Sequence, residues 1–276
     1  MKTRIYQICY SPETLTNVPE GFLVLDNLKN ERTDWREYWP MRQFLLSNYL
    51  SDEVLYGFMS PKFMQKTGLN HQQVESFIQA NYRGQDIVSF SPFWDLTSIF
   101  KNVFEQGDFF HPGLTNACQA FADAHIAGLD LRDAITHSQN TVFCNYFLAK
   151  KSFWLEWLKL GELLFNEAEN QQSELAKILN ESTTYGVQSL PMKIFVQERL
   201  ATICLLANPK MECLAYSPFL IGASTTPFNQ FLRESILSDA LKMAYSHTEQ
   251  GSYLQAFSEI RNNIIESLGQ VEVTTP

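Results

Sequence analysis

Three side chains that can take up or release a proton lie close together between residues 86 and 113. They are Glu105, Asp108 and His111. Each of them could act as a general base, because a hydroxyl group that attacks as a nucleophile must lose its proton. His111 is followed by Pro112-Gly113, which would hold it in a rigid turn. The alternative is that Asp108 and His111 pair with each other and only close the loop.

Two lysines indicate a possible site for an anion. Lys62 and Lys66 are four residues apart, so they share one face if this segment is helical. Two neighbouring cations in an otherwise acidic chain could hold a diphosphate group. A solvated pair of surface lysines would produce the same spacing.

The stretch that contains the three acid–base candidates begins as a buried strand. Ile87 and Phe90 belong to this predicted strand, which ends at Ser91-Pro92. We expect a polar and aromatic loop to follow, with Asp95 and Asn102 among its side chains. Ligands of open α/β sheets bind outside the carboxyl ends of the strands, so this loop is expected to form the floor and rim of a ligand site.

Runs of β-branched and aromatic residues predict four further strands. They are Arg4–Tyr10, Gly21–Leu25, Val54–Met59 and Thr141–Ala149. Asp26 and Asn27 follow the second of these runs and are plausible ligand contacts, although a simple turn also explains them. Asn145 is the strongly polar residue inside the last run, where it must either brace the backbone or face the cleft.

The pattern changes near residue 150. Residues 1–150 alternate strands and loops, whereas residues 151–276 are almost entirely helical, and we expect the helical portion to pack on the first as one continuous domain. In the predicted helix Lys193–Leu206, Glu198 lies on an apolar line and therefore needs a partner. Arg199 should point about 100° away from it, so the partner is expected to come from elsewhere.

The last two predicted helices are Thr226–His247 and Ser252–Leu268, which should pair as an antiparallel hairpin. Such a hairpin could cover the sheet or build a homodimer contact.

Several kinds of chemistry lack their motifs. His111, His125 and His137 do not have the spacing of metal ligands, and a divalent metal is not favoured. A serine hydrolase elbow, a dinucleotide fingerprint and a P-loop are missing from the sequence, and none of the cysteines has the setting of a nucleophile. We therefore expect no metal and no bound cofactor.

Composition restricts the partners. The net charge is -9 and no basic patch interrupts it, so nucleic acid is an unsuitable partner. The five cysteines are scattered, which predicts reduced thiols in a cytoplasmic protein. The chain has no run of about 18 apolar residues, so no membrane span is expected, and no signal peptide is evident.

Four phrases of the sequence resemble one group of bacterial proteins. They are Tyr56–Gly68 (YGFMSPKFMQKTG), Asp86–Pro92 (DIVSFSP), Asn102–Gly113 (NVFEQGDFFHPG) and Asn145–Ala149 (NYFLA), and Gln197–Leu200 (QERL) is similar to a late motif of related domains. The group consists of glycosyltransferase-like proteins from surface-polysaccharide loci, with a GT-A type fold. The resemblance implies a GT-A-like mixed sheet flanked by helices, with a mainly helical C-terminal portion.

The resemblance also implies a function and a site. The activity would be transfer of a sugar from a nucleotide sugar to a bacterial surface glycan. The first strand, ending at Tyr10, and Asp26-Asn27 would contact the nucleotide. Lys62, Lys66 and Arg83 would offset the diphosphate charge, while Glu105, Asp108 and His111 would supply the base and acceptor contacts. Asp95, Asn102 and Asn145 would face the substrate, and Glu198 would brace the cleft.

One departure from the group concerns the metal. GT-A enzymes usually carry an Asp-x-Asp at the end of a central strand, where it holds a divalent metal against the diphosphate. Here the comparable strand ends Ser89-Phe90-Ser91-Pro92. The sequence therefore predicts either a metal-independent transferase or, alternatively, a catalytically inactive binding or scaffold protein in polysaccharide biosynthesis.

Overall fold

The structure, a computed structural model, describes residues 1–170, 172–221, 224 and 226–268. Its centre is a six-stranded sheet with the order β2-β1-β3-β5-β4-β8. Strand β5 runs antiparallel to both of its neighbours, and the other pairs are parallel. The strands are β1 (Lys2–Cys9), β2 (Leu23–Asp26), β3 (Val54–Met59), β4 (Ile87–Ser89), β5 (Phe147–Ala149) and β8 (Cys213–Ala215). The predicted mixed α/β class is confirmed.

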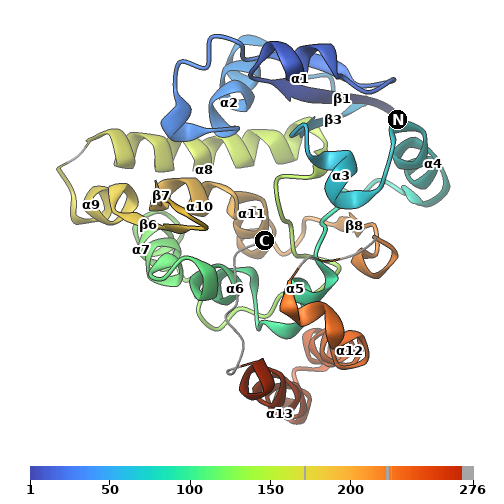
Figure 1. The fold of residues 1–276 in the computed structure, drawn as a ribbon, viewed down its shortest axis with the longest axis vertical. Coiled ribbons are helices and arrows are strands. Elements are labelled where there is room, and N and C mark those ends of the chain that lie inside the picture. Colours follow the sequence, from blue (N-terminus) through green and yellow to red (C-terminus); the bar gives the residue numbers. More distant parts are fainter. Residues whose placement is uncertain (171, 222–223, 225, 269–276) are drawn as a thin grey trace.

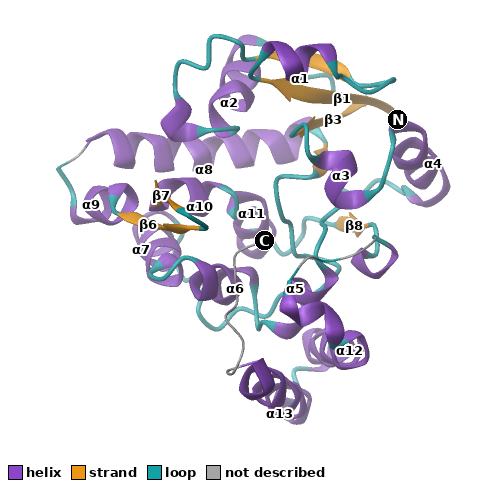
Figure 2. Cartoon of the chain, viewed as in Figure 1, coloured by secondary structure: helices purple, strands orange, loops and turns teal. Residues whose placement is uncertain are grey.

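Helices flank this sheet and fill most of the remaining chain (Figures 1 and 2). Before residue 150 they are α1 (Pro12–Thr16), η1 (Thr33–Trp35), α2 (Tyr38–Ser47), α3 (Phe63–Thr67), α4 (His71–Asn81), α5 (Trp94–Ile99), α6 (Val103–Phe110) and α7 (Leu114–His125). After it come α8 (Lys151–Asn170), α9 (Glu174–Asn180), α10 (Met192–Gln197), α11 (Leu200–Ala207), η2 (Pro218–Leu220), η3 (Pro227–Gln230), α12 (Leu232–Thr248) and α13 (Gly251–Leu268).

Local sequence rules explain several helix starts. Ser11 accepts a hydrogen bond from the Thr14 backbone N–H and so caps α1, with Pro12 in the first turn. Asn70 caps α4 in the same way through Gln73. The capped α1 directly follows β1, which fixes where the chain leaves the end of that strand.

The core joins the sheet to the long helix α8. All six residues of β3 are buried, as expected for a central strand. Trp154 of α8 is fully buried, stacks on Phe147 with ring centroids 4.7 Å apart, and donates from Nε1 to the Tyr56 carbonyl at 2.9 Å. The largest cluster of buried side chains therefore includes residues from both sides of position 150.

The polar segment after β4 is helical, so the prediction of a loop there is wrong. Asn102 starts α6 by accepting from the backbone N–H groups of Phe104 and Glu105, at 3.0 and 2.8 Å. The side-chain oxygen of Asn102 thus pairs with N–H groups that have no partner within the helix.

Two further predictions need correction. The strand predicted at Thr141–Ala149 is limited to β5, because Cys144 and Asn145 have left-handed backbones with φ of 57° and 54°. The helix predicted at Lys193–Leu206 breaks between α10 and α11, at Glu198 and Arg199. Strand β8 and the hairpin formed by β6 (Ser182–Tyr185) and β7 (Gln188–Pro191) were not predicted from the sequence.

The predicted pair of C-terminal helices is present as α12 and α13, which pack on each other at one end of the molecule (Figure 1). Helix α12 also packs on α5. Within the part of the chain that the structure describes, we find no helix with the length and apolar character needed to cross a membrane.

Candidate functional site

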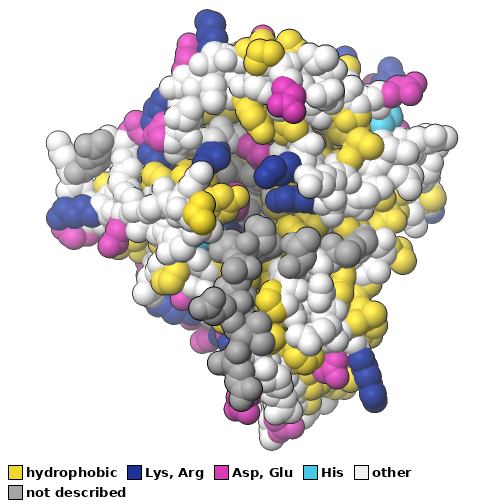
Figure 3. Space-filling view, viewed as in Figure 1, with side chains coloured by type: hydrophobic (Ala, Val, Ile, Leu, Met, Phe, Trp, Pro, Cys, Tyr) yellow, Lys and Arg dark blue, Asp and Glu magenta, His cyan; other side chains and the backbone are white. Residues whose placement is uncertain are grey.

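A cavity of about 620 Å³ opens at the carboxyl ends of β1, β2 and β3. This is where ligands bind in open α/β sheets, and the volume is in the range of small-molecule sites. Figure 3 shows the same face, with basic and acidic side chains gathered around a hollow between the elements that Figure 1 labels α1 and α10. Strand β1 contributes Ile8, Tyr10 directly follows β1, and Asn27 directly follows β2.

The opposite wall comes from the second half of the chain. It consists of the hairpin residue Tyr185, then Leu190 and Pro191 at the end of β7, and Phe195 of α10. Part of the lining is polar: Ser60, just after β3, has its hydroxyl 2.6 Å from the hydroxyl of Tyr146. The cavity thus combines aromatic and apolar walls with a few placed polar groups, as ligand sites commonly do.

Two lysines from the start and end of α3 enter the cavity. Lys62 is exposed, whereas Lys66 is half-buried, with its ammonium 3.4 Å from the sulfur of Cys144 and 5.5 Å from the centre of the Phe93 ring. Burial opposes the charge of Lys66, but Cys144 and nearby carboxylates outweigh it and raise its pKa. Burial raises the pKa of the Cys144 thiol to about 11, so this thiol is neutral at pH 7. The Lys66 ammonium is therefore a fixed positive charge in the cavity.

Two carboxylates, Glu37 and Glu198, line the cavity beside these lysines. Glu37 immediately precedes α2, and Glu198 lies at the break between α10 and α11. Burial, followed by repulsion from Glu198, raises the pKa of Glu37 to about 7, against the opposing effects of Lys66, Arg36 and Lys62. A carboxyl group with this pKa exchanges a proton readily at neutral pH.

Gln197 places an unpaired buried donor in the cavity lining. Its side chain lines the cavity and is only 2% exposed, yet the amide nitrogen Nε2 has no hydrogen-bond partner within the described residues. Buried donors are nearly always paired, so a ligand oxygen at this position would satisfy it.

One carboxylate of the cavity, that of Asp34, is already paired with positively charged side chains. Asp34 accepts two hydrogen bonds of 2.8 Å from Arg32 and one of 2.9 Å from Lys193. Arg32, despite the opposing effect of burial, and then Lys193 lower the pKa of Asp34 to about 2. This cluster holds η1 against α10, which positions Glu37 a few residues further along the chain.

Five of the site residues that were predicted from the sequence line the cavity. They are Tyr10, Asn27, Lys62, Lys66 and Glu198. The partner of Glu198 differs from the one predicted: Arg199 Nη1 lies 3.4 Å from Glu198 Oε2. Both residues lie in the turn between α10 and α11, so the 100° separation of a continuous helix does not apply.

The three acid–base candidates lie outside the cavity lining. Glu105 accepts from the Lys101 backbone N–H at 2.6 Å and pairs with Arg261. Asp108 accepts from the N–H groups of Gly113 and Thr115, at 3.1 and 3.0 Å.

His111 is buried behind Phe195, with ring centroids 3.8 Å apart, and its Nδ1 is 2.6 Å from the carbonyl of Thr184. Burial lowers the pKa of His111 to about 4, so the ring is neutral at pH 7 and Nδ1–H donates to this carbonyl.

The remaining predicted site residues lie outside the cavity lining. Asp26 accepts from the Leu28 N–H at 2.9 Å, and Arg83 donates to the carbonyls of Tyr82 and Ala80 at 2.8 Å each. Asp95 is fully buried and accepts from Ser224 at 2.5 Å, and Asn102 caps α6. Asn145 is buried with both side-chain amide atoms unpaired among the described residues.

The polar and aromatic cavity residues that were not predicted from the sequence include Arg36, Glu37, Tyr185 and Gln197. Glu37 and Arg36 lie in a charged segment that resembles an ordinary solvated connection. Tyr185 lies on a hairpin that was not predicted. Gln197 alone carried a signal, because a polar residue inside an apolar run must be paired or face a site.

Within the described residues, no group of three or more His, Cys, Asp or Glu side chains is arranged to hold a metal ion. In comparisons with known proteins, no family model, no curated protein and no solved structure matched this chain.

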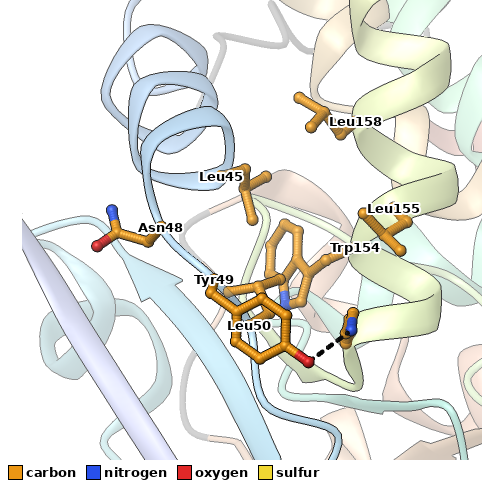
Figure 4. A pocket seen from close by; sticks show the side chains of 8 residues that line it. Leu45, Asn48, Tyr49, Leu50, Trp154, Leu155 and Leu158 are labelled. Atoms are coloured by element: carbon orange, nitrogen blue, oxygen red, sulfur yellow. Dashed lines mark hydrogen bonds between the residues drawn. The ribbon is translucent and has the colours of Figure 1, made fainter.

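A second pocket lies between α2 and α8 and is much smaller, at about 130 Å³ (Figure 4). Its walls are mainly apolar, with Leu45, Trp154 and Leu158 among them, and Tyr49 bonds to Lys151 at 3.5 Å on its rim. This volume is below the range of small-molecule sites, so the larger cavity is the candidate site.

Proposed function

We propose that the large cavity binds a nucleotide sugar and that the protein transfers its sugar to a bacterial surface glycan without a metal ion. The observation that supports this most directly is the position of Lys62 and Lys66 in a ligand-sized cavity at the carboxyl ends of β1, β2 and β3. The resemblance to GT-A type glycosyltransferases and the parallel arrangement of β1, β2 and β3 agree with this assignment.

In this proposal, each side of the cavity has its own task. Tyr10 and Asn27, at the ends of the first two strands, contact the nucleoside. Lys66 and Lys62 hold the diphosphate and offset the charge that develops on it as the bond to the sugar breaks. Tyr185, which is 41% exposed, provides an aromatic surface against which a ring of the ligand can stack.

The end of β4 supports the metal-independent form of the proposal. In the resemblance to GT-A enzymes, Ser89 and Ser91 correspond to the Asp-x-Asp, and their hydroxyls are 3.0 Å apart. Ser91 also donates to the Thr141 carbonyl and accepts from the Phe143 N–H, both at 2.9 Å. These hydroxyls are occupied within the fold, and in this proposal Lys62 and Lys66 supply the positive charge opposite the diphosphate.

The same observation favours a second candidate, a protein that binds nucleotide sugars without turning them over. A thermal-shift screen against UDP-glucose, GDP-mannose and CMP-sialic acid tests binding, and hydrolysis of the stabilising compound tests turnover. We expect one of them to raise the melting temperature and to be slowly hydrolysed. Stabilisation without hydrolysis or transfer would support the binding protein, and no stabilisation of a folded sample would refute both candidates.

A further inference from the structure

Glu37 is the carboxylate of the cavity that has no assigned partner. Among the hydrogen bonds and ion pairs of the described residues, none involves its side chain, whereas Glu198 pairs with Arg199 and Asp34 pairs with Arg32 and Lys193. The Glu37 side chain is half-buried and lies in the cavity lining. A carboxylate that is partly shielded from water and has no hydrogen-bond or ion-pair partner is suited to accept a proton.

We propose that Glu37 is the general base of the sugar transfer. This inference rests on the proposed function. In the step, the proton of the acceptor hydroxyl moves to a Glu37 carboxylate oxygen as the acceptor oxygen forms a bond to the anomeric carbon. The bond from that carbon to the diphosphate breaks, and its electron pair leaves on the diphosphate oxygen beside Lys66 and Lys62.

Charged and titratable groups from every side determine how Glu37 holds its proton. They are Arg36 beside it in the chain, Lys62 and Lys66 of the α3 segment, Cys144 and Tyr146 before β5, and Glu198 after α10. Burial and then Glu198 raise the pKa of Glu37, and the three cations lower it. A base works best when its pKa is near the working pH, and this balance keeps Glu37 there.

The other candidates are less suited to this step. Glu105 is paired with Arg261, and the Asp108 carboxylate accepts two backbone N–H groups. His111 has one ring nitrogen bonded to the Thr184 carbonyl and lies behind Phe195. None of these three lines the cavity.

The test compares wild type with Glu37→Gln, Glu198→Gln and the exposed control Glu174→Gln. Calorimetry first measures the affinity for the nucleotide sugar that gave the largest thermal shift. Hydrolysis of that compound is then followed from pH 5 to 9. In parallel, the carboxyl groups of the ligand-free proteins are titrated by NMR after labelling of the glutamate carboxyl carbons.

We expect Glu37→Gln to lower kcat at least about 100-fold, the low end for a general base, while the affinity for the nucleotide sugar stays within about 3-fold. It should also remove one carboxyl resonance that titrates near neutral pH. Glu198→Gln should move the acid limb of the kcat profile to lower pH, because it removes the repulsion. Glu174→Gln should match wild type.

Two results would overturn the assignment. One is a Glu37→Gln variant that binds and turns over like wild type, which would leave the proposed function intact without this base. The other is the absence of any Glu37-dependent titration between pH 6 and 8. If no nucleotide sugar binds wild type, the proposed function fails and the base fails with it.

Discussion

Replacing Lys66 by Met is expected to weaken the binding of a nucleoside diphosphate about 10-fold to 150-fold. Met keeps most of the length and apolar character of the side chain and removes only its charge and donors. In the structure this ammonium is half-buried against Cys144 and the Phe93 ring, so water screens it poorly. The removal therefore tests electrostatics more than packing.

The magnitude follows from the surroundings of the two lysines. A hydrogen bond to a charged group contributes about 1.5–3 kcal/mol, and each 1.4 kcal/mol is about tenfold in affinity, which gives the range above for Lys66. Lys62 is exposed, so its contact with a phosphate is worth at most about 1 kcal/mol, or roughly fivefold. The order of the two effects is set by burial and is independent of which base or sugar the ligand carries.

Isothermal titration with UDP and with GDP measures both variants, next to the exposed control Lys177→Met. Thermal unfolding of each free protein shows whether the loss of the Lys66–Cys144 contact disturbs the fold. An affinity of Lys66→Met within twofold of wild type would refute the assignment of the diphosphate. So would a larger loss in Lys62→Met than in Lys66→Met.

Three further predictions concern the fold. The buried ammonium of Lys242 donates to two carbonyls near the end of α5, at 2.6 and 2.7 Å, so Lys242→Met should lower the free energy of unfolding in urea by about 2–5 kcal/mol. Burial lowers the pKa of Lys242 to about 7. The stability advantage of wild type should therefore grow between pH 7 and about 10, where only the unfolded chain keeps the proton. A Cβ at Gly161 would lie 2.7 Å from the Tyr38 ring, so Gly161→Ala should lower the free energy of unfolding by about 1–3 kcal/mol, and an unchanged denaturation midpoint would contradict this packing. Burial holds the pKa of His111 near 4, so the unfolded chain binds a proton at this residue before the folded chain does. Wild type should therefore lose stability relative to His111→Asn as the pH falls from about 6.5 to 4. A constant difference in Tm between the two proteins over that range would argue against the buried ring.

Elements governed by local rules could be predicted from the sequence. The strand β1 and the capped helix after it follow from a β-branched run and from Ser11-Pro12, and α4 follows from Asn70. Strand β3 followed from the apolar run Val54–Met59. These signals depend on a few neighbouring residues, so tertiary contacts did not need to be known.

The strand predicted at Thr141–Ala149 was too long, because the length of a strand depends on pairing with strands that are distant in the sequence. The run has the right composition, but β3 and β4 offer partners only to its last three residues. The left-handed Cys144 and Asn145 then turn the chain so that the Cys144 sulfur reaches the cavity and Lys66. Neither of these two residues is a glycine, so composition gave no indication of this turn.

The cavity could be predicted only in part for the same reason. Tyr10, Asn27 and Lys62 follow strand ends, where the position of a ligand site is a general property of α/β sheets. Glu37 and Gln197 enter the cavity only because α10 packs on the η1 segment. Their roles depend on contacts between residues more than 150 positions apart, which no local pattern contains.

The density of polar residues between positions 86 and 113 shows why polarity alone is an ambiguous sign of chemistry. After β4, this segment forms two short helices that are followed closely by a third, and every helix start leaves backbone N–H groups without partners. Asn102 satisfies such groups at α6, and Asp108 does so at the start of α7. A short helix needs as many capping groups as a long one, so a run of short helices concentrates Asn, Asp and Glu in the sequence. The more specific sign of chemistry is a polar group without such a task in a cavity, and Glu37 and Gln197 meet that condition among the residues that the structure describes.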